Sequence, residues 1–170
     1  MKRTLAILLA LLMALSIASC GAQTAKSSKT PDGYTIYENE AISFAYPEDW
    51  TVTDGSTVTI TGPNGNNITV VYEDKTDMYE SMTTESYKSE LVPVYESMGL
   101  AIENPTVKQT KHNGMKFTIF THTMITSTKR VDQTQYITTI GDKTHIVTVT
   151  EVVADDALVE NVLQTLNKVN

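Results

Sequence analysis

The sequence predicts an α+β domain in which amphipathic helices cover an antiparallel sheet. Three observations lead to this fold class. Short alternating segments in the first half have the period of strands, and two later segments have the period of helices. Between the two helical segments lie further strand-like segments joined by short turns, which antiparallel strands permit and parallel strands do not.

The first strands are expected in the segment that ends before Asp74. They are Tyr34–Tyr37, Ala41–Tyr46, Trp50–Thr53, Thr57–Thr61 and Ile68–Glu73. Turn signals separate them: Pro47-Glu48-Asp49 breaks the chain before Trp50, Asp54-Gly55 follows the third strand, and Pro63-Asn64-Gly65-Asn66 precedes the fifth.

The period then changes to that of a helix. Tyr87, Leu91, Val94, Tyr95 and Met98 fall on one helical face, and Gly99 suits the C-terminal cap. Asp77 and Glu80 have the spacing of a capping box at the helix start. Since Pro93 falls inside this pattern, the helix is expected either to be kinked or to begin later than Asp77.

Four strands in a meander follow, and a helix ends the chain. The expected strands are Val107–Lys111, Met115–Ile125, Val131–Ile140 and Thr144–Val153, and Asn113-Gly114 is a strong hairpin signal between the first two. The final helix has an apolar stripe, with Asp155 and Asp156 at its N-terminal end and Lys168 at the other. The stripe consists of Leu158, Val159, Val162, Leu163, Leu166 and Val169.

The start of the chain has the layout of an export signal. Lys2 and Arg3 precede an apolar run from Leu5 to Leu15, and Ile17-Ala18-Ser19-Cys20 then resembles the lipobox of bacterial lipoproteins. The resemblance implies that Cys20, the single cysteine, is diacylated with fatty acids such as palmitate and becomes the mature N-terminus. An uncleaved anchor and an ordinary signal-peptidase site are the alternatives, but the run is short for a membrane span of about 20 residues.

Three segments are therefore expected along the chain. Residues 1–19 form a lipoprotein signal peptide, residues 20–33 the lipidated cysteine and a flexible tether, and residues 34–170 a single domain. The expected location is the extracytoplasmic face of a cell membrane, on the outer surface or in a periplasm. One-membrane and two-membrane cells are both possible.

The charge argues against nucleic acid as a partner. Loss of residues 1–19 would remove Lys2 and Arg3 from the 13 basic residues and leave all 20 acidic ones, so the formal charge would change from −7 to −9. Nucleic-acid binding and electrostatic docking on anionic lipid both need a basic surface. We therefore expect contact with the membrane through the acyl chains on Cys20.

The segment Ile42-Ser-Phe44-Ala-Tyr46-Pro47-Glu-Asp-Trp50, with the order of elements after it, resembles the PsbP-like superfamily over about residues 34–170. The superfamily includes extrinsic photosystem II proteins, a Ran-binding eukaryotic relative and many bacterial lipoproteins. The resemblance implies an α/β/α sandwich around an antiparallel sheet, no catalytic residues, and action by binding. Phe44 and Trp50 are expected in the core, where Pro47 ends a strand.

No catalytic constellation is evident. Gly-x-Ser-x-Gly is absent, the serines and threonines of residues 118–128 are interpreted as strand formers on a solvated face, and the glycine-rich segment of residues 62–67 is interpreted as a turn. The three histidines are expected to be ordinary and partly exposed. His112 and His145 would lie on one rim about 14 Å apart, too far to share a metal, and His122 would lie near the opposite end beside Phe120 and Met124.

Acidic clusters and tyrosines are the remaining candidates for a site. The acidic clusters are Glu38/Glu40, Glu48/Asp49, Glu73/Asp74/Asp77 and Asp155/Asp156, and none has calcium-loop spacing. The segment of residues 73–77 is the best of them for weak cation binding. Eight tyrosines against three phenylalanines suit either strands or a binding surface.

These observations predict a membrane-anchored lipoprotein whose domain is not an enzyme and needs no cofactor or metal. Its expected role is that of a binding or accessory domain for a protein partner or a membrane complex. The alternative is a lipoprotein that binds a small molecule or a cell-wall ligand in a tyrosine-lined pocket. A hydrolase is a third possibility, and it would require a serine and a carboxylate close to His122 or His145.

Overall fold

The computed structural model describes residues 30–169. The predicted signal peptide, Cys20 and all but the end of the predicted tether lie outside the described residues. Within them, no helix combines the length and the apolar character that crossing a bilayer requires.

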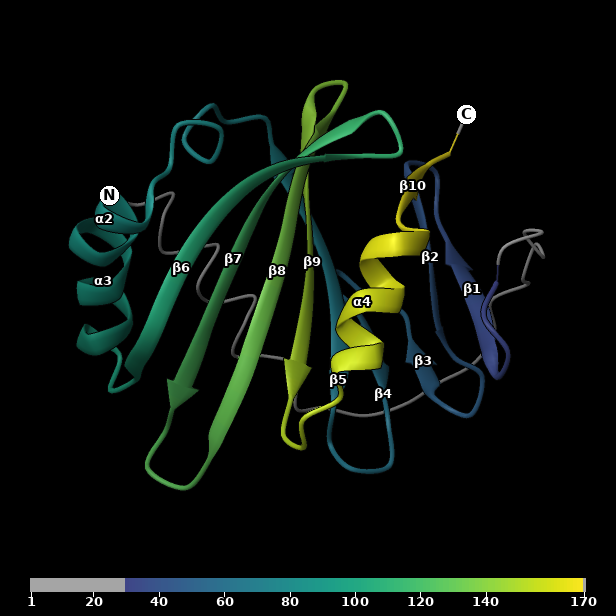
Figure 1. Ribbon diagram of the computed structural model, residues 1–170, viewed down its shortest axis with the longest axis horizontal. Coiled ribbons are helices and arrows are strands. Elements are labelled where there is room, and N and C mark those ends of the chain that lie inside the picture. Colours follow the sequence, from purple (N-terminus) through teal and green to yellow (C-terminus); the bar gives the residue numbers. More distant parts are fainter. Residues whose placement is uncertain (1–29, 170) are drawn as a thin grey trace.

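A seven-stranded antiparallel sheet forms the centre of the domain, in the order β3-β4-β5-β9-β8-β7-β6 (Figure 1). Its strands are β3 (Thr51–Thr53), β4 (Val58–Thr61), β5 (Asn67–Asp74), β6 (Ala101–His112), β7 (Met115–Ile125), β8 (Arg130–Ile140) and β9 (Lys143–Glu151). The last four form the predicted meander, in which β6 is one edge of the sheet and β9 pairs with β5. The predicted fold class is confirmed.

A second, three-stranded sheet was not predicted as a separate element. It consists of β1 (Tyr34–Glu38), β2 (Ile42–Pro47) and the short β10 (Asn167–Lys168), in the order β1-β2-β10. The C-terminal strand pairs with β2 through Asn167↔Ser43 and Lys168↔Ile42. The final helix, α4 (Asp156–Thr165), therefore ends at Thr165, about one turn before the predicted Val169, because the chain leaves it at the extended Leu166 to join this sheet.

One face of the central sheet is covered by α4 and β2, and the core on this side is almost entirely apolar. Phe44, Ile68 and Leu158 are fully buried there. Asp155 caps α4 by accepting a hydrogen bond from the Leu158 amide at 3.1 Å, as the sequence predicts. Trp50 is half-buried against this core and packs on Gly62, where a Cβ would lie 2.4 Å from the indole. Gly62 is thus needed for this close contact.

The middle helical segment covers the opposite face. It consists of α2 (Thr84–Ser86), the π-helical turn η1 (Tyr87–Leu91) and α3 (Val92–Ser97), with Tyr87, Tyr95 and Phe120 buried beneath it. The capping box is formed by Thr83 and Ser86, so its prediction at Asp77 and Glu80 was wrong. The helical segment begins at Thr84, later than Asp77, as one of the two expectations had it. Pro93 lies in the first turn of α3, where a missing N–H costs little.

The longer strands differ from the sequence prediction in two ways. The first of them, β6, starts at Ala101 rather than Val107, and a bulge at residues 104–105 shifts its register. The threonines expected on a solvated face are partly buried, because the helices leave neither face of the sheet bare. Thr118 is 3% exposed and Thr123 is 6% exposed.

Candidate functional site

The β6–β7 hairpin turns at Asn113-Gly114, as predicted. Both residues have positive φ, 48° and 77°, which is the conformation of a tight two-residue hairpin turn. The hairpin tip leans over the C-terminal end of α4 (Figure 1). There Asn113 Nδ2 donates to the Leu166 carbonyl at 3.2 Å, and the His112 ring bonds the Gln164 carbonyl at 3.0 Å. These bonds supply partners for helix carbonyls that would otherwise lack them.

Because the hairpin leans toward α4, the end of β7 separates from β8. The ladder between the two strands runs from Ile125↔Arg130 to Thr118↔Ile137 and stops there. Beyond that pair, the Thr138 hydroxyl donates to the Lys116 carbonyl at 2.9 Å and links the two strand ends. A wedge thus opens from Thr118 toward the hairpin tips.

The strand alternation determines which main-chain groups face this wedge. The residues that flank each two-residue turn form a hydrogen-bonded pair: His112 with Met115 between β6 and β7, and Ile140 with Lys143 between β8 and β9. Alternate residues of β7 and β8 therefore direct their N–H and C=O groups toward each other, and Lys116 and Thr139 are the first of these beyond the ladder. The Lys116 amide and both main-chain groups of Thr139 have no ladder partner.

The wedge is a cleft of about 540 Å³. Its two walls are continuous lengths of strand, residues 114–118 of β7 and 137–141 of β8, and further lining comes from Tyr79, Glu80, Gln109 and Lys168. Ligand pockets typically enclose about 300–1,000 Å³, so the cleft has the size of a small-molecule site. Tyr79 is fixed at its edge because Thr118 Oγ1 and Gln109 Nε2 donate to its carbonyl at 2.9 and 3.2 Å.

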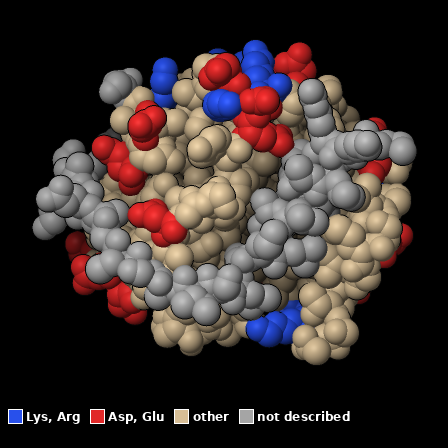
Figure 2. Space-filling view, turned by 180° about the vertical axis from the view of Figure 1, so that it is seen from behind, with Lys and Arg blue, Asp and Glu red and all other residues tan. Residues whose placement is uncertain are grey.

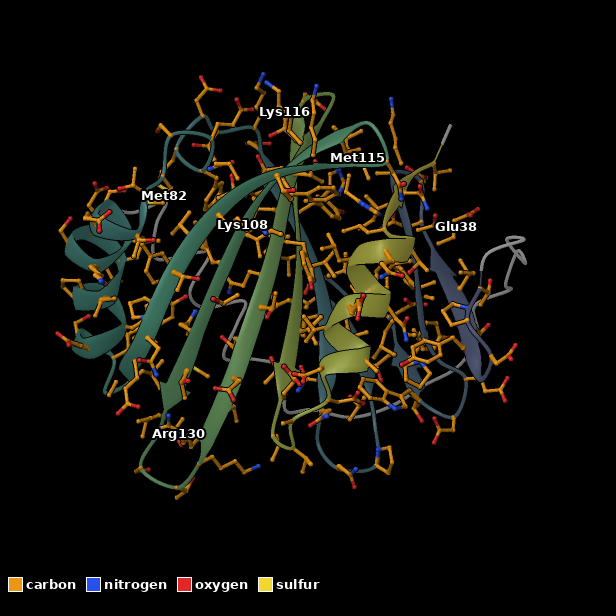
Figure 3. All side chains as sticks on the ribbon, viewed as in Figure 1. Glu38, Met82, Lys108, Met115, Lys116 and Arg130 are labelled. Atoms are coloured by element: carbon orange, nitrogen blue, oxygen red, sulfur yellow. The ribbon has the colours of Figure 1, made fainter. Side chains whose placement is uncertain are left out.

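Three lysines lie at or beside this cleft. Lys116 and Lys168 line it, and Lys111 is paired directly with Lys116 across the hairpin. Lys116 is labelled at the upper edge of the sheet in Figure 3, and Figure 2 shows basic side chains gathered along the upper edge with acidic ones beside them. None of the three lysines has an ion-pair partner among residues 30–169, where Arg130 pairs with Glu103 and Lys143 pairs with Asp74.

A buried polar network lies below the cleft, on the face of the sheet that the middle helical segment covers. The Tyr87 hydroxyl bonds His122 Nδ1 at 3.1 Å, His122 Nε2 bonds Gln133 Oε1 at 3.1 Å, and Gln133 Nε2 donates to Thr150 Oγ1 at 3.0 Å. The Gln133 oxygen requires a proton on Nε2, and in the neutral ring Nδ1 then accepts from the Tyr87 hydroxyl. Burial lowers the pKa of His122 to about 4, against smaller opposing effects of Gln133 and Asp132.

The predictions for the histidines were therefore partly wrong. His112 is half-buried, as expected, but His122 is 4% exposed and His145 is 5% exposed. The prediction failed because both faces of the sheet are covered. His122 does lie on the face of Phe120 and Met124, as expected. Both of its nitrogens are occupied in a network without a serine or a carboxylate, so this histidine lacks the partners of a hydrolase.

The predicted acidic clusters form no group of three or more potential metal ligands within residues 30–169. In the cluster at the end of β5, Asp74 pairs with Lys143 at 2.8 Å. The pKa of Glu73 is raised, chiefly by burial. Asp155, in the last cluster, is a helix cap, and the glycine-rich segment of residues 62–67 is a turn in which the Gly65 amide donates to the Gly62 carbonyl.

Most of the tyrosines are core residues. Tyr37, Tyr46, Tyr79, Tyr87, Tyr95 and Tyr136 are buried, while Tyr72 is 64% exposed. The cleft has one tyrosine, Tyr79, on its lining. Strand and core positions therefore account for the tyrosine excess, and the cleft is lined mainly by lysines, threonines and apolar residues of β7 and β8.

Lys111, Lys116 and Lys168 were not predicted as site residues from the sequence. For Lys111 and Lys116, a local signal does exist. The two-residue turn at Asn113-Gly114 sets the hairpin register, and this register alone places Lys111 opposite Lys116.

The comparisons with known proteins agree with this architecture. No protein-family model matches the sequence, and no curated protein matches it. Among solved structures, the solution structure of cyanobacterial PsbP (CyanoP) from Synechocystis sp. PCC 6803 matches with a TM-score of 0.61 at 14% identity, and the match covers 90% of this chain and 99% of that one. The domain has the PsbP-like fold.

A crystal structure from Bacteroides thetaiotaomicron VPI-5482 matches more weakly, with a TM-score of 0.48 at 15% identity over 76% of this chain and 45% of that one. The PsbP-like fold is therefore assigned from the CyanoP match, and the sequence resemblance seen at Ile42–Trp50 is confirmed at the level of the fold. In this chain the fold places the separating ends of β7 and β8 at the upper edge of the sheet (Figure 1).

Proposed function

We propose that this chain is a non-catalytic accessory domain, held by lipid at the extracytoplasmic face of a membrane, that binds a partner through the cleft between β7 and β8. The observation that carries the proposal is the PsbP-like fold over nearly the whole described chain. The lipobox-like Ile17–Cys20 ahead of the domain supports the lipid anchor.

The described residues also support a binding role over a catalytic one. The cleft lining combines lysines, threonines and one glutamate with apolar side chains, and it includes no histidine or cysteine. The most perturbed histidine, His122, is enclosed in a hydrogen-bonded network outside the cleft. Binding requires only the cleft geometry and its donors.

The anchor is tested with the full-length chain and a Cys20→Ser variant, expressed in a bacterial host that has lipoprotein lipidation. We expect the wild-type chain to take up an alkyne analogue of palmitate and to sediment with membranes, because diacylation provides lasting membrane affinity. The variant should take up no label. An unlabelled wild-type chain in the soluble fraction would contradict the anchored location.

The partner is tested by crosslinking in the same intact cells. A photoreactive amino acid at position 111, beside the cleft, should give a discrete crosslinked product, and the same group at Lys129, in the turn before β8, should not. Products that are equal at the two positions would contradict binding through the cleft.

A second candidate is a small-molecule or cell-wall ligand-binding lipoprotein, and the cleft volume of about 540 Å³ favours it. Native mass spectrometry of the protein released from membranes distinguishes the two. A bound mass below about 1 kDa that is lost on substitution of Lys116 supports the small ligand. A protein-sized crosslink from position 111 supports the accessory domain.

A further inference from the structure

We propose that the cleft between β7 and β8 binds a carboxylate group, received by the main-chain amide of Lys116 and by the ammonium groups of Lys116 and Lys168. The proposal rests on the proposed binding function of the cleft and is independent of the lipid anchor. Three features of the described residues lead to it.

The first feature is an unbalanced positive charge. Lys111 and Lys116 are direct cross-strand neighbours, an arrangement that is unfavourable for like charges. Lys168 lines the same cleft from β10. None of these lysines is ion-paired within residues 30–169, although the chain as a whole has 20 acidic residues and a formal charge of −7. A bound anion would offset the repulsion.

The second feature is an excess of hydrogen-bond donors. The Lys116 carbonyl, the acceptor on the β7 wall, already accepts from the Thr138 hydroxyl at 2.9 Å. Beyond the end of the ladder, the Lys116 amide, the Thr139 amide and the Thr139 hydroxyl are three donors against one remaining acceptor, the Thr139 carbonyl. A carboxylate, which only accepts hydrogen bonds, is complementary to such a wall.

The third feature is the shape of the cleft. It narrows toward the last ladder pair, Thr118↔Ile137, where the walls come to the separation of paired strands. A planar carboxylate fits a wedge between two strands better than a tetrahedral phosphate does. Glu80 also lines the cleft, and its negative charge disfavours a dianion more than a monoanion.

The same carboxylate chemistry has two sources, a small free acid or the C-terminal carboxylate of a chain. Both place one acid group in the wedge, and they differ in the length of ligand outside it. The test therefore uses acetate, a hexa-alanine peptide with a free C-terminus and an acetylated N-terminus, the same peptide with a C-terminal amide, and inorganic phosphate.

The experiment is a titration of the full-length lipoprotein in detergent micelles, followed by the backbone amide resonances. We expect acetate and the free-acid peptide to shift the Lys116 and Thr139 amides with saturation, and the amidated peptide to leave them unchanged. Phosphate should bind more weakly than acetate. A peptide that binds at least tenfold more tightly than acetate indicates a chain end, and equal affinities indicate a small acid; both support the carboxylate site.

Lysine variants separate a built site from general charge attraction. Lys116→Gln and Lys168→Gln should each weaken carboxylate binding about tenfold, as expected for the loss of one charge-assisted hydrogen bond. Lys129→Gln, which removes the same charge in the turn before β8, should not change it. The proposal is overturned if no ligand gives saturable shifts at Lys116, if phosphate binds more tightly than acetate, or if Lys129→Gln weakens binding equally. None of these results would affect palmitate labelling or crosslinking, so failure of the carboxylate site is distinguishable from failure of the proposed function.

Discussion

The two ends of the β7–β8 pair differ in the pairing of their strands and in the partners of their charged side chains. From Thr118↔Ile137 down to Ile125↔Arg130 the strands are paired residue by residue, and helices or the second sheet cover both faces. Beyond Thr118 the ladder between the strands ends, Lys116 lies beside the buried Met115 and Phe117, and main-chain groups lose their strand partners. The paired length provides stability, while the open end offers donors to a ligand. Substitutions in the two regions should therefore affect different measurements.

The largest effect is expected in the covered region. Phe44 is fully buried on the α4 side, with its ring centroid 5.1 Å from that of Tyr37. Phe44→Ala removes that packing and leaves a cavity, so the free energy of unfolding should fall by about 3–5 kcal/mol. Urea denaturation measures it. A loss below about 1 kcal/mol would show that this face is not the main core.

The next effect is a dependence on pH from the buried network. His122 has a folded pKa of about 4, lowered by burial from the ordinary 6.5. Between these pH values His122 binds a proton in the unfolded chain but not in the folded chain. The free energy of unfolding therefore has its full value above pH 6.5 and decreases as the pH falls toward 4. The decrease attributable to His122 is about 3 kcal/mol.

Urea denaturation at several pH values between 7 and 4 measures this decrease. The control is His122→Gln, which should be less stable at pH 7 but should show a shallower slope. An equal slope in the variant would assign the acid sensitivity to other groups, including His145, whose pKa burial also lowers.

A smaller effect is expected at the junction of the two regions. Asn113→Gly retains a residue suited to a φ of 48° but removes the amide that bonds the Leu166 carbonyl. The free energy of unfolding should fall by about 1 kcal/mol, the typical contribution of one hydrogen bond. Amide exchange should also accelerate at His112 and Met115, the pair that closes the hairpin, because the hairpin tip loses a contact with α4. Unchanged exchange there would contradict the role of Asn113 in fixing the hairpin tip on α4.

The smallest change in stability is expected at the open end itself. Lys116→Gln removes one charge of the Lys111–Lys116 pair, so the free energy of unfolding should stay the same or rise by a few tenths of a kcal/mol. Arg130→Gln is the matched control at the paired end, where it breaks the exposed bond to Glu103 and should cost about 0–1 kcal/mol. A marked loss of stability in Lys116→Gln would make Lys116 a structural residue.

The sequence predicted the regular elements better than their tertiary arrangement. Local signals determined the Asn113-Gly114 turn, the strand Met115–Ile125 and the Gly99 cap, and all three are confirmed. The first half of β6 was missed because Pro105 and the bulge interrupt its alternation. The strand β10 was missed because its two residues form a strand only through distant pairing with β2.

The candidate site was less accessible from the sequence. The separation of β7 from β8 results from contacts between His112 or Asn113 and the end of α4, about fifty positions away in the chain. No local pattern encodes such contacts. The burial of His122 likewise depends on a helix that packs over the second face of the sheet, and strand periodicity alone does not show this cover.

The most direct test of the account is hydrogen exchange at single amides of β7 and β8. The strand alternation directs the amides of Thr118 and Lys116 from β7 toward β8, and those of Ile137 and Thr139 from β8 toward β7. Each strand thus has one such amide in the paired region and one at the open end. The account predicts strong protection at Thr118 and Ile137 and fast exchange at Lys116 and Thr139, slowed when a carboxylate ligand is added. Equal protection at all four amides without ligand would mean that the strands stay paired to their ends, and would contradict the cleft.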